Sequence, residues 1–212
     1  MGRKPFVEVP NGTFHVYARG NSHQSLFIDD ADRERYLRIL ADAVADFRWR
    51  CLAYCLMGNH VHLVLETPQA NLSRGMCAAH FAYARSFNLR HGRVNHLFGE
   101  RFGRAELRDP QHVRRIALYV AQNPVEAGLC SRPEAWPWNS YGIVKDGGAP
   151  PWLDVDALAG HFGGLRRYLD LAGDVGHSGS DGARGDHVLP DLRAAVRDGG
   201  DGGGGAADEA AA

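Results

Sequence analysis

Two apolar runs, residues 51–57 and 61–65, separated by Gly58-Asn59, constrain the fold more than any other feature of this chain. Each run has the length of a strand, and a Gly-Asn pair suits the positive backbone angles of a tight hairpin turn. We therefore expect two adjacent antiparallel strands. On the second strand His60 and His62 share one face, while Val61 points into the opposite layer.

The sequence on either side of this hairpin alternates between strand and helix patterns. Residues 13–19 predict a strand, and the aspartates at 29–32 cap and begin a helix. Asn71 caps a second long helix that ends near His91-Gly92, and its expected apolar positions are Leu72, Met76, Ala79, Phe81, Tyr83 and Phe87. The basic stretch 93–108 predicts a loop with a short strand. This order predicts an α+β fold, a ferredoxin-like antiparallel sheet with helices on one face.

A third helix opens at Asp109-Pro110 and carries Tyr119 in its last full turn. We expect it to end near Asn123-Pro124, because proline cannot continue the helical hydrogen bonds. Tyr119 and Asn123 are four residues apart and therefore occupy the same helix face.

Three regions follow from composition. Residues 1–145 form the expected catalytic domain, and residues 146–172 form a helical appendage interrupted near Gly163-Gly164. Residues 173–212 are rich in Gly, Asp and Ala and predict a disordered tail, since they bury too little apolar surface to offset their ordering entropy.

Charge is divided unevenly between these regions. Residues 1–145 hold 19 Lys/Arg against 13 Asp/Glu, whereas residues 146–212 hold 5 against 12. A positive folded part permits a polyanionic partner such as nucleic acid. No secretory signal precedes the four cysteines and no apolar run is long enough to span a bilayer, so we expect a cytoplasmic protein with reduced thiols and no membrane partner.

Four side chains together supply the parts for phosphodiester transesterification. His60 and His62 offer two imidazoles, Asn123 offers an amide oxygen, and Tyr119 is a phenol nucleophile. Each pair alone more often has a structural role. In such a case one histidine is hydrogen-bonded and the other is at the surface, while Tyr119 packs in the core and Asn123 ends the helix before Pro124. Taken together, they predict a divalent metal site in which the reaction chemistry favours Mg2+ or Mn2+.

A cluster of arginines interleaved with aromatic residues predicts a surface for single-stranded nucleic acid between residues 74 and 115. Arg101 and Arg104 are the preferred contacts because they flank a Gly-rich loop, and Arg93 and Arg19 complete the predicted set of DNA-binding residues. Individually, most such residues fit an ordinary solvated basic face.

A zinc site is an alternative, because a two-residue hairpin loop would place Cys55 opposite His62. The cluster would consist of Cys51, Cys55, His60 and His62. The Cys-x3-Cys spacing with His-x-His is unusual for a zinc finger, and packing is the favoured role for both cysteines.

Five ordered blocks of the sequence resemble the single-tyrosine HUH transposases (His, hydrophobe, His), especially the REP-associated tyrosine transposases. These blocks are FHVYARGN, FIDDADRERYL, CLMGNHVHLV, FNLRHGRVNHLFGERF and LYVAQNPVEAGL, followed by WPWNSY. Gly58 stands where family members usually have proline, and Asn95 where glycine is common.

The resemblance implies that His60 and His62 bind the metal, Asn123 is the third ligand and Tyr119 is the nucleophile, whereas Tyr83 lacks such partners. It also implies single-stranded DNA with hairpins of palindromic repeats as the partner. The expected reaction is nicking and rejoining through a 5′-phosphotyrosine with a free 3′-hydroxyl, by a monomer or a homodimer. Two other functions stay open: a non-catalytic nucleic-acid-binding protein that retains the fold, and a zinc-stabilised regulator.

Overall fold

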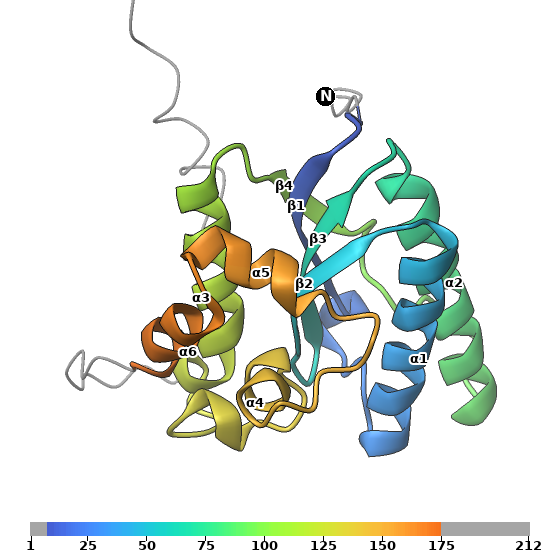
Figure 1. Cartoon of the computed structure of the whole chain (residues 1–212). Coiled ribbons are helices and arrows are strands. Elements are labelled where there is room, and N and C mark those ends of the chain that lie inside the picture. The colour runs from blue at the N-terminus through green and yellow to red at the C-terminus, as the bar shows by residue number, and fades with distance from the viewer. Residues whose placement is uncertain (1–7, 175–212) are drawn as a thin grey trace, which may run out of the picture. The chain divides into compact units, whose positions relative to one another are not determined.

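The computed structural model describes residues 8–174, which build one four-stranded sheet between two layers of helices (Figure 1). The elements in chain order are β1 (Gly12–Arg19), a 3-10 turn (Asn21–His23), α1 (Asp30–Asp46), β2 (Arg50–Leu56), β3 (His60–Thr67), α2 (Leu72–Arg90), β4 (Gly103–Glu106), α3 (Pro110–Glu126), a second 3-10 turn (Pro133–Ala135), α4 (Ser140–Lys145), α5 (Val155–Phe162) and α6 (Leu165–Gly173).

The sheet has the strand order β2-β3-β1-β4, and all neighbouring strands are antiparallel. This order, with α1 between β1 and β2 and α2 between β3 and β4, confirms the α+β ferredoxin-like prediction. The predicted short strand within 93–108 is the edge strand β4.

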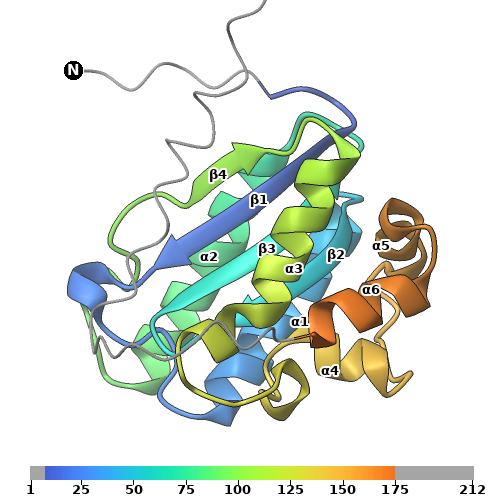
Figure 2. The same cartoon turned by 90° about the vertical axis from the view of Figure 1, so that its left-hand side faces the viewer.

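Helices cover both faces of the sheet rather than one, which corrects that part of the prediction. Helices α1 and α2 lie on one side, and α3 crosses the other side, where it contacts β2 and β3 (Figure 2). The central strand β1 is covered on both faces. Phe14 and Val16 are fully buried on one face, and His15 is fully buried on the other. A strand that is buried on both faces shows little alternation of apolar and polar residues. The sequence of β1 therefore gives little sign of a second helical layer.

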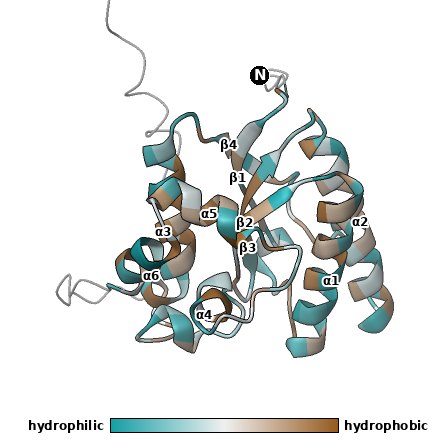
Figure 3. Cartoon of the chain, in the orientation of Figure 1, coloured by the Kyte–Doolittle hydropathy of each residue, from teal (hydrophilic) through white to brown (hydrophobic). Residues whose placement is uncertain are grey.

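The main core lies between the sheet and helices α1 and α2. Apolar side chains of β1 and β3 meet Tyr36 and Leu40 of α1 and Met76 and Tyr83 of α2, all of them buried. Both helices also carry hydrophilic residues (Figure 3), as expected for helices with one face on a core.

The turn between β2 and β3 has the predicted length but not the predicted conformation. Met57 N donates to His60 O at 2.9 Å across the turn, yet neither Gly58 nor Asn59 has a positive φ. The turn carbonyls are occupied instead, because Gly58 O accepts from Leu26 N and Asn59 O accepts from Gly20 N. Contacts with residues 20–27 therefore determine this turn more than its own sequence does.

Two helix ends also differ from the prediction. Asn71 precedes α2 as expected, but its side chain makes no cap bond; its Oδ1 accepts from Trp49 Nε1 at 2.7 Å. Helix α3 starts at Pro110 after the Asp109 cap, as predicted, but it continues through Pro124 to Glu126. A proline in the last turn removes only one hydrogen-bond donor, so Tyr119 lies about two turns before the helix end.

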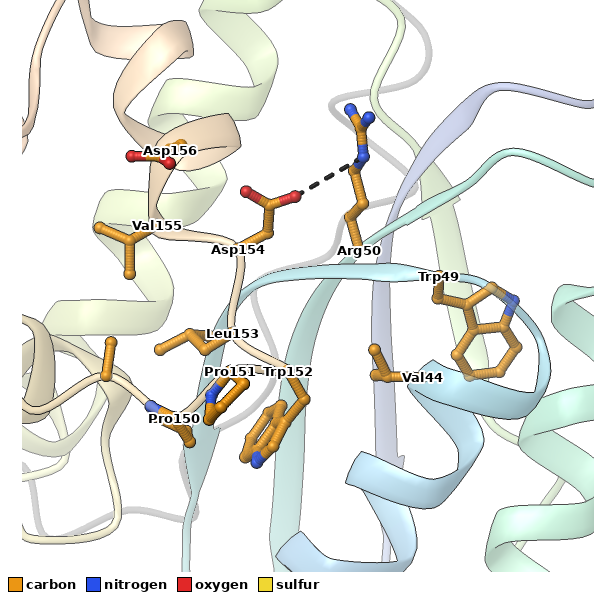
Figure 4. Close-up of a pocket in the computed structure, with 11 residues that line it drawn as sticks. Val44, Trp49, Arg50, Pro150, Pro151, Trp152, Leu153, Asp154, Val155 and Asp156 are labelled. Carbon is orange, nitrogen blue, oxygen red and sulfur yellow. Dashed lines mark ion pairs between the residues drawn. The ribbon is translucent and has the colours of Figure 1, made fainter.

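The appendage is tied to the outer strand β2. Asp154 N donates to Cys51 O at 2.8 Å, and the carboxylate of Asp154 pairs with Arg50 at 3.6 Å (Figure 4). Helices α5 and α6 follow, separated by Gly163 and Gly164 with φ of 73° and 135°, at the predicted interruption. Both helices contact α3. The predicted tail falls almost entirely outside the described residues.

Candidate functional site

His60 and His62 lie on the face of β3 that α3 covers. Cross-strand partners share a face of the sheet, and in the β1–β3 register Tyr17 is opposite His62 and Arg19 is opposite His60. Val61 belongs to the core on the other face, as expected. The strand period therefore brings the two imidazoles together, with their ring centroids 5.1 Å apart.

His62 is the most enclosed of these side chains, with no exposed surface. Its Nδ1 lies 3.0 Å from Nε2 of His15, and its Nε2 has no hydrogen-bond partner among the described residues. Burial, reinforced by the neighbouring His15 and His60, holds the pKa of His62 well below its usual range. The ring is therefore neutral at pH 7, and its Nε2 can bind a ligand when the ring proton is on Nδ1.

His60 is buried apart from 7% of its surface. Its Nδ1 lies 2.7 Å from Oδ1 of the adjacent Asn59, the last residue of the hairpin turn. An amide oxygen at Nδ1 favours the tautomer with the proton on that nitrogen, which leaves Nε2 as the lone-pair donor. The turn thus orients the first histidine of the pair.

Tyr119 projects from α3 onto the histidine face. Its ring centroid lies 5.4 Å from that of His62, edge to face, and 6.1 Å from that of His15. Burial, with a smaller contribution from Glu126, raises the pKa of Tyr119 to about 12, while a hydrogen bond from Asn123 acts in the opposite direction. The phenol is therefore protonated at neutral pH.

Asn123 follows one turn later on the same helix and is 2% exposed. Its Oδ1 is buried without a hydrogen-bond partner among the described residues. A buried amide oxygen without a hydrogen-bond donor costs free energy unless a ligand binds it. Like Nε2 of His62, this atom therefore indicates a ligand-binding position.

His15 is the residue of this cluster that sequence reasoning missed. It is fully buried on β1, and its ring stacks on that of His62 with centroids 5.2 Å apart. Burial, together with the charge on nearby His112, lowers the pKa of His15 to about 3, so it is neutral. Alternation along residues 13–19 places His15 on the same face as Tyr17 and Arg19, but its closeness to His62 required the register of two distant strands.

The side chains of the candidate site include donors for a divalent cation. Within residues 8–174 no group of three or more His, Cys, Asp or Glu side chains is arranged to hold a metal ion. The candidate site consists instead of two imidazoles and one amide oxygen, and two of its buried atoms, His62 Nε2 and Asn123 Oδ1, have no hydrogen-bond partner among these residues. Such a set leaves the remaining positions to water and substrate oxygens.

The zinc alternative is wrong for these residues. Cys55 is opposite His62 in register, as predicted, but its Sγ lies 3.5 Å from the sulfur of Met57, and Cys51 points into the apolar core. Burial raises the pKa of both thiols. Protonated thiols in apolar surroundings are packing groups rather than metal ligands.

Tyr83 is excluded as a competing nucleophile. Its ring is 1% exposed in the core under α1, and its hydroxyl donates to Leu26 O at 2.6 Å. It lies on the other side of the sheet from His60 and His62.

The four predicted DNA-binding arginines do not lie on one surface. Arg19 is on the histidine face opposite His60. Arg104 is paired with the core residue Val16 and donates to Ser73 Oγ at 3.1 Å, so it lies on the α2 side of the sheet, and Arg101 lines a groove on that side. Arg93 hydrogen-bonds the side chain of Gln24 and lies over the ring of Phe87, contacts that anchor the loop.

No helix among residues 8–174 combines the length and apolar character required to cross a membrane.

Comparison with known proteins identifies a family. Residues 8–123 match the family model described as transposase IS200 like. A search of curated proteins finds no match. The fold is similar to the structure of a REP-associated tyrosine transposase bound to a REP hairpin, with 16% identity, a TM-score of 0.60, and coverage of 71% of this chain and 89% of that one.

A second similar structure is a putative transposase from Deinococcus radiodurans, with 20% identity, a TM-score of 0.39, and coverage of 57% of this chain and 94% of that one. The family match spans more than half of the sequence and contains His60, His62, Tyr119 and Asn123. This chain therefore belongs to the family of IS200-like transposases.

Proposed function

We propose that this protein nicks and rejoins single-stranded DNA at hairpins of palindromic repeats, with Tyr119 as the nucleophile. The observation that carries the proposal is the edge-to-face approach of Tyr119 to His62, at 5.4 Å between ring centroids, on a face with two buried atoms that lack hydrogen-bond partners among residues 8–174. The family and the fold neighbour bound to a REP hairpin support the substrate class.

His60, His62 and Asn123 are the residues that would hold Mg2+ or Mn2+. When bound, the ion polarises the scissile phosphate and offsets charge on the leaving oxygen. His60 and His62 are oriented for this role from outside the site, by Asn59 and His15 respectively. Asn123 contributes its unpartnered amide oxygen from the same helix as the nucleophile.

Tyr119 performs the covalent step. The bond from its phenolic oxygen to phosphorus forms as the bond from phosphorus to the 3′ oxygen breaks, and the 3′ oxygen leaves as a hydroxyl after gaining a proton. The phenol, whose pKa is about 12, loses its proton in this step. The 5′-phosphotyrosine keeps the energy of the phosphodiester, so attack by a 3′-hydroxyl reverses the reaction and joins strands without ATP.

Arginines would hold the DNA backbone near the site. Arg19 is opposite His60 on the same face and is placed to contact a phosphate beside the scissile bond. Arg101 and Arg104 lie on the α2 side of the sheet, at its β4 edge. They would therefore contact DNA that has passed around this edge from the histidine face. Arg93 contributes by anchoring the loop that carries Arg101.

The test is formation of a protein–DNA adduct that survives denaturation. Full-length protein is incubated with Mg2+ or Mn2+ and a 3′-labelled single strand that bears a hairpin, because a 5′-phosphotyrosine retains the 3′ label. We expect an adduct from wild type and from Tyr83→Phe, and none from Tyr119→Phe or His60→Ala/His62→Ala. An adduct that persists in Tyr119→Phe overturns the nucleophile assignment, and hairpin binding without any adduct supports a non-catalytic binding protein instead.

A further inference from the structure

A groove of about 990 Å³ runs along the outer side of α2, between this helix and residues 94–104. It lies on the α2 side of the sheet, away from Tyr119, because Arg104 at its edge is the cross-strand partner of the core residue Val16. No residue proposed above for the covalent step lines it. The groove is thus distinct from the candidate metal site.

Aromatic and apolar groups form much of its surface. His80 and Phe98 stack with ring centroids 4.2 Å apart, and Phe102 meets His80 edge-on. Phe81 is 71% exposed and Val94 is 95% exposed. Large apolar side chains held in water along a groove favour a ligand that covers them.

The charge of the groove indicates an anionic ligand. Four arginines line it, and Glu100 is its one acidic residue. Arg74, Arg85 and Arg101 form no ion pair with another residue in the described part of the chain, while the guanidinium of Arg104 lies 5.5 Å from the ring centroid of Phe102. An anion with flat apolar faces satisfies both parts of this surface.

We propose that this groove binds the single-stranded DNA that flanks the hairpin, with bases stacked on Phe81 and the aromatic wall and phosphates on the arginines. Single-stranded DNA offers free base faces, whereas a duplex has its base faces already stacked and offers only phosphates and base edges. The inference rests on the proposed function for the identity of the substrate.

The same strand can reach both surfaces around the β4 edge of the sheet. Arg19 on the histidine face and Arg104 on the groove side belong to neighbouring strands, and Arg104 pairs with Val16, three residues from Arg19 along β1. Three residues of a strand span about 10 Å. A flank that passes around this edge would contact the groove while its hairpin junction lies at Tyr119.

The first test measures DNA affinity without metal ions, so that no strand is cut. Fluorescence anisotropy compares a hairpin that carries a single-stranded flank with the same hairpin lacking it. We expect Phe81→Ala to weaken binding of the flanked hairpin by roughly 5- to 100-fold, the loss of one stacked base, and to leave the flankless hairpin unchanged. The control is Leu89→Ala, since Leu89 is 84% exposed on the same helix but does not line the groove.

Equal affinity of Phe81→Ala and Leu89→Ala for the flanked hairpin overturns the proposal. An equal loss for both hairpins also overturns it, because the groove then holds the duplex. The result is separable from the covalent chemistry: if wild type forms no adduct but Phe81→Ala still loses the flank, the groove stands and the nicking function fails.

A second test uses Cys77, an exposed cysteine that lines the groove. We expect the flanked hairpin to slow its modification by a maleimide at least several-fold in wild-type protein. Cys130 does not line the groove and serves as the internal control. Unchanged modification of Cys77 at saturating DNA contradicts occupation of the groove.

Discussion

His15 Nε2 lies 3.0 Å from His62 Nδ1, and this one contact determines which nitrogen of His62 is available to a metal. Both rings are neutral, and a hydrogen bond between these two nitrogens requires one of them to carry the proton and the other to accept it. If His62 donates it, His62 Nε2 carries a lone pair and can ligate; if His15 donates it, His62 Nε2 carries a proton and cannot. Metal ligation therefore requires His15 to be the acceptor, a positioning role.

We predict that His15→Leu weakens Mn2+ binding by about 10- to 100-fold, the usual effect of losing the partner that orients a ligating histidine. His15→Gln keeps an acceptor and should restore part of the affinity. Calorimetry or electron paramagnetic resonance measures the binding, and nitrogen NMR of the metal-free protein reads the tautomer of His62. Unaltered Mn2+ affinity in His15→Leu contradicts this role.

Stability should fall as the pH decreases below about 6.5. Burial lowers the pKa of His80 to about 4 and that of His15 to about 3, so each stays neutral in the folded protein where the unfolded chain takes up a proton. The unfolded state therefore binds more protons, and the free energy of unfolding drops between pH 6.5 and about 3. Urea denaturation at several pH values measures this slope.

His80→Gln provides the matched variant for that slope. Its amide can still meet the Tyr36 hydroxyl, which lies 3.3 Å from His80 Nε2, but it takes up no proton on unfolding. The pH dependence of the unfolding free energy should then decrease by the equivalent of one proton. An identical slope in wild type and His80→Gln would show that His80 does not stay neutral.

Asp32 ties the start of α1 to the end of α2, and its replacement should be costly. Burial raises the pKa of Asp32, but bonds from Ile28 N, His91 and Arg90 outweigh it and lower the pKa overall. We expect Asp32→Asn to lower the free energy of unfolding at pH 7 by about 2 kcal/mol, the scale of a hydrogen bond to a charged group.

The difference between Asp32→Asn and wild type should shrink in acid. The folded pKa is depressed, so the stabilisation is present above the unfolded pKa near 3.8 and is lost as the pH falls through the folded value. Glu34→Gln is the control, because the exposed Glu34–Arg38 pair at 3.6 Å should contribute less than about 1 kcal/mol. Equal effects of the two substitutions in urea denaturation would refute the prediction.

Two glycines should respond to alanine in opposite directions. A Cβ at Gly75 in α2 would lie 2.2 Å from the ring of Trp49, so Gly75→Ala should destabilise the protein by about 1–3 kcal/mol through overpacking. A Cβ at Gly58 would meet nothing within 4 Å, and Gly58 lacks a positive φ. Gly58→Ala should therefore raise the unfolding free energy by about 0.4–1 kcal/mol, measured by urea denaturation. Destabilisation by both substitutions would contradict this account of Gly58.

Most of the fold was predictable from local sequence signals. The caps Asp29 and Asp109, the hairpin length and the break at Gly163 depend on neighbouring residues, and each was predictable. The predicted angles at Gly58 were wrong, because residues 20–27, distant in sequence, bond the turn carbonyls. The predicted end of α3 was too early, because a proline in the last turn removes only one hydrogen-bond donor. The second helical layer was missed because β1, buried on both faces, shows little alternation.

The candidate site also combines contacts that local sequence predicts with contacts that it does not. His60 with His62, and Tyr119 with Asn123, are pairs fixed by strand and helix periods, so the sequence places each pair on one face. His15 joins them only through the β1–β3 register. Phe81, named from sequence as one of the apolar positions of the second helix, is 71% exposed. Pattern alone does not distinguish an apolar residue that packs in the core from one that awaits a ligand.

The contacts of α3 with α5 and α6 have a kinetic consequence. Because the chain's own appendage packs on the helix that carries Tyr119, each polypeptide in this conformation brings its tyrosine to its own histidines. The initial rate of adduct formation at saturating DNA should then be first order in protein, and mixing Tyr119→Phe with His60→Ala/His62→Ala should restore no activity. Complementation in that mixture would reveal tyrosines shared between chains.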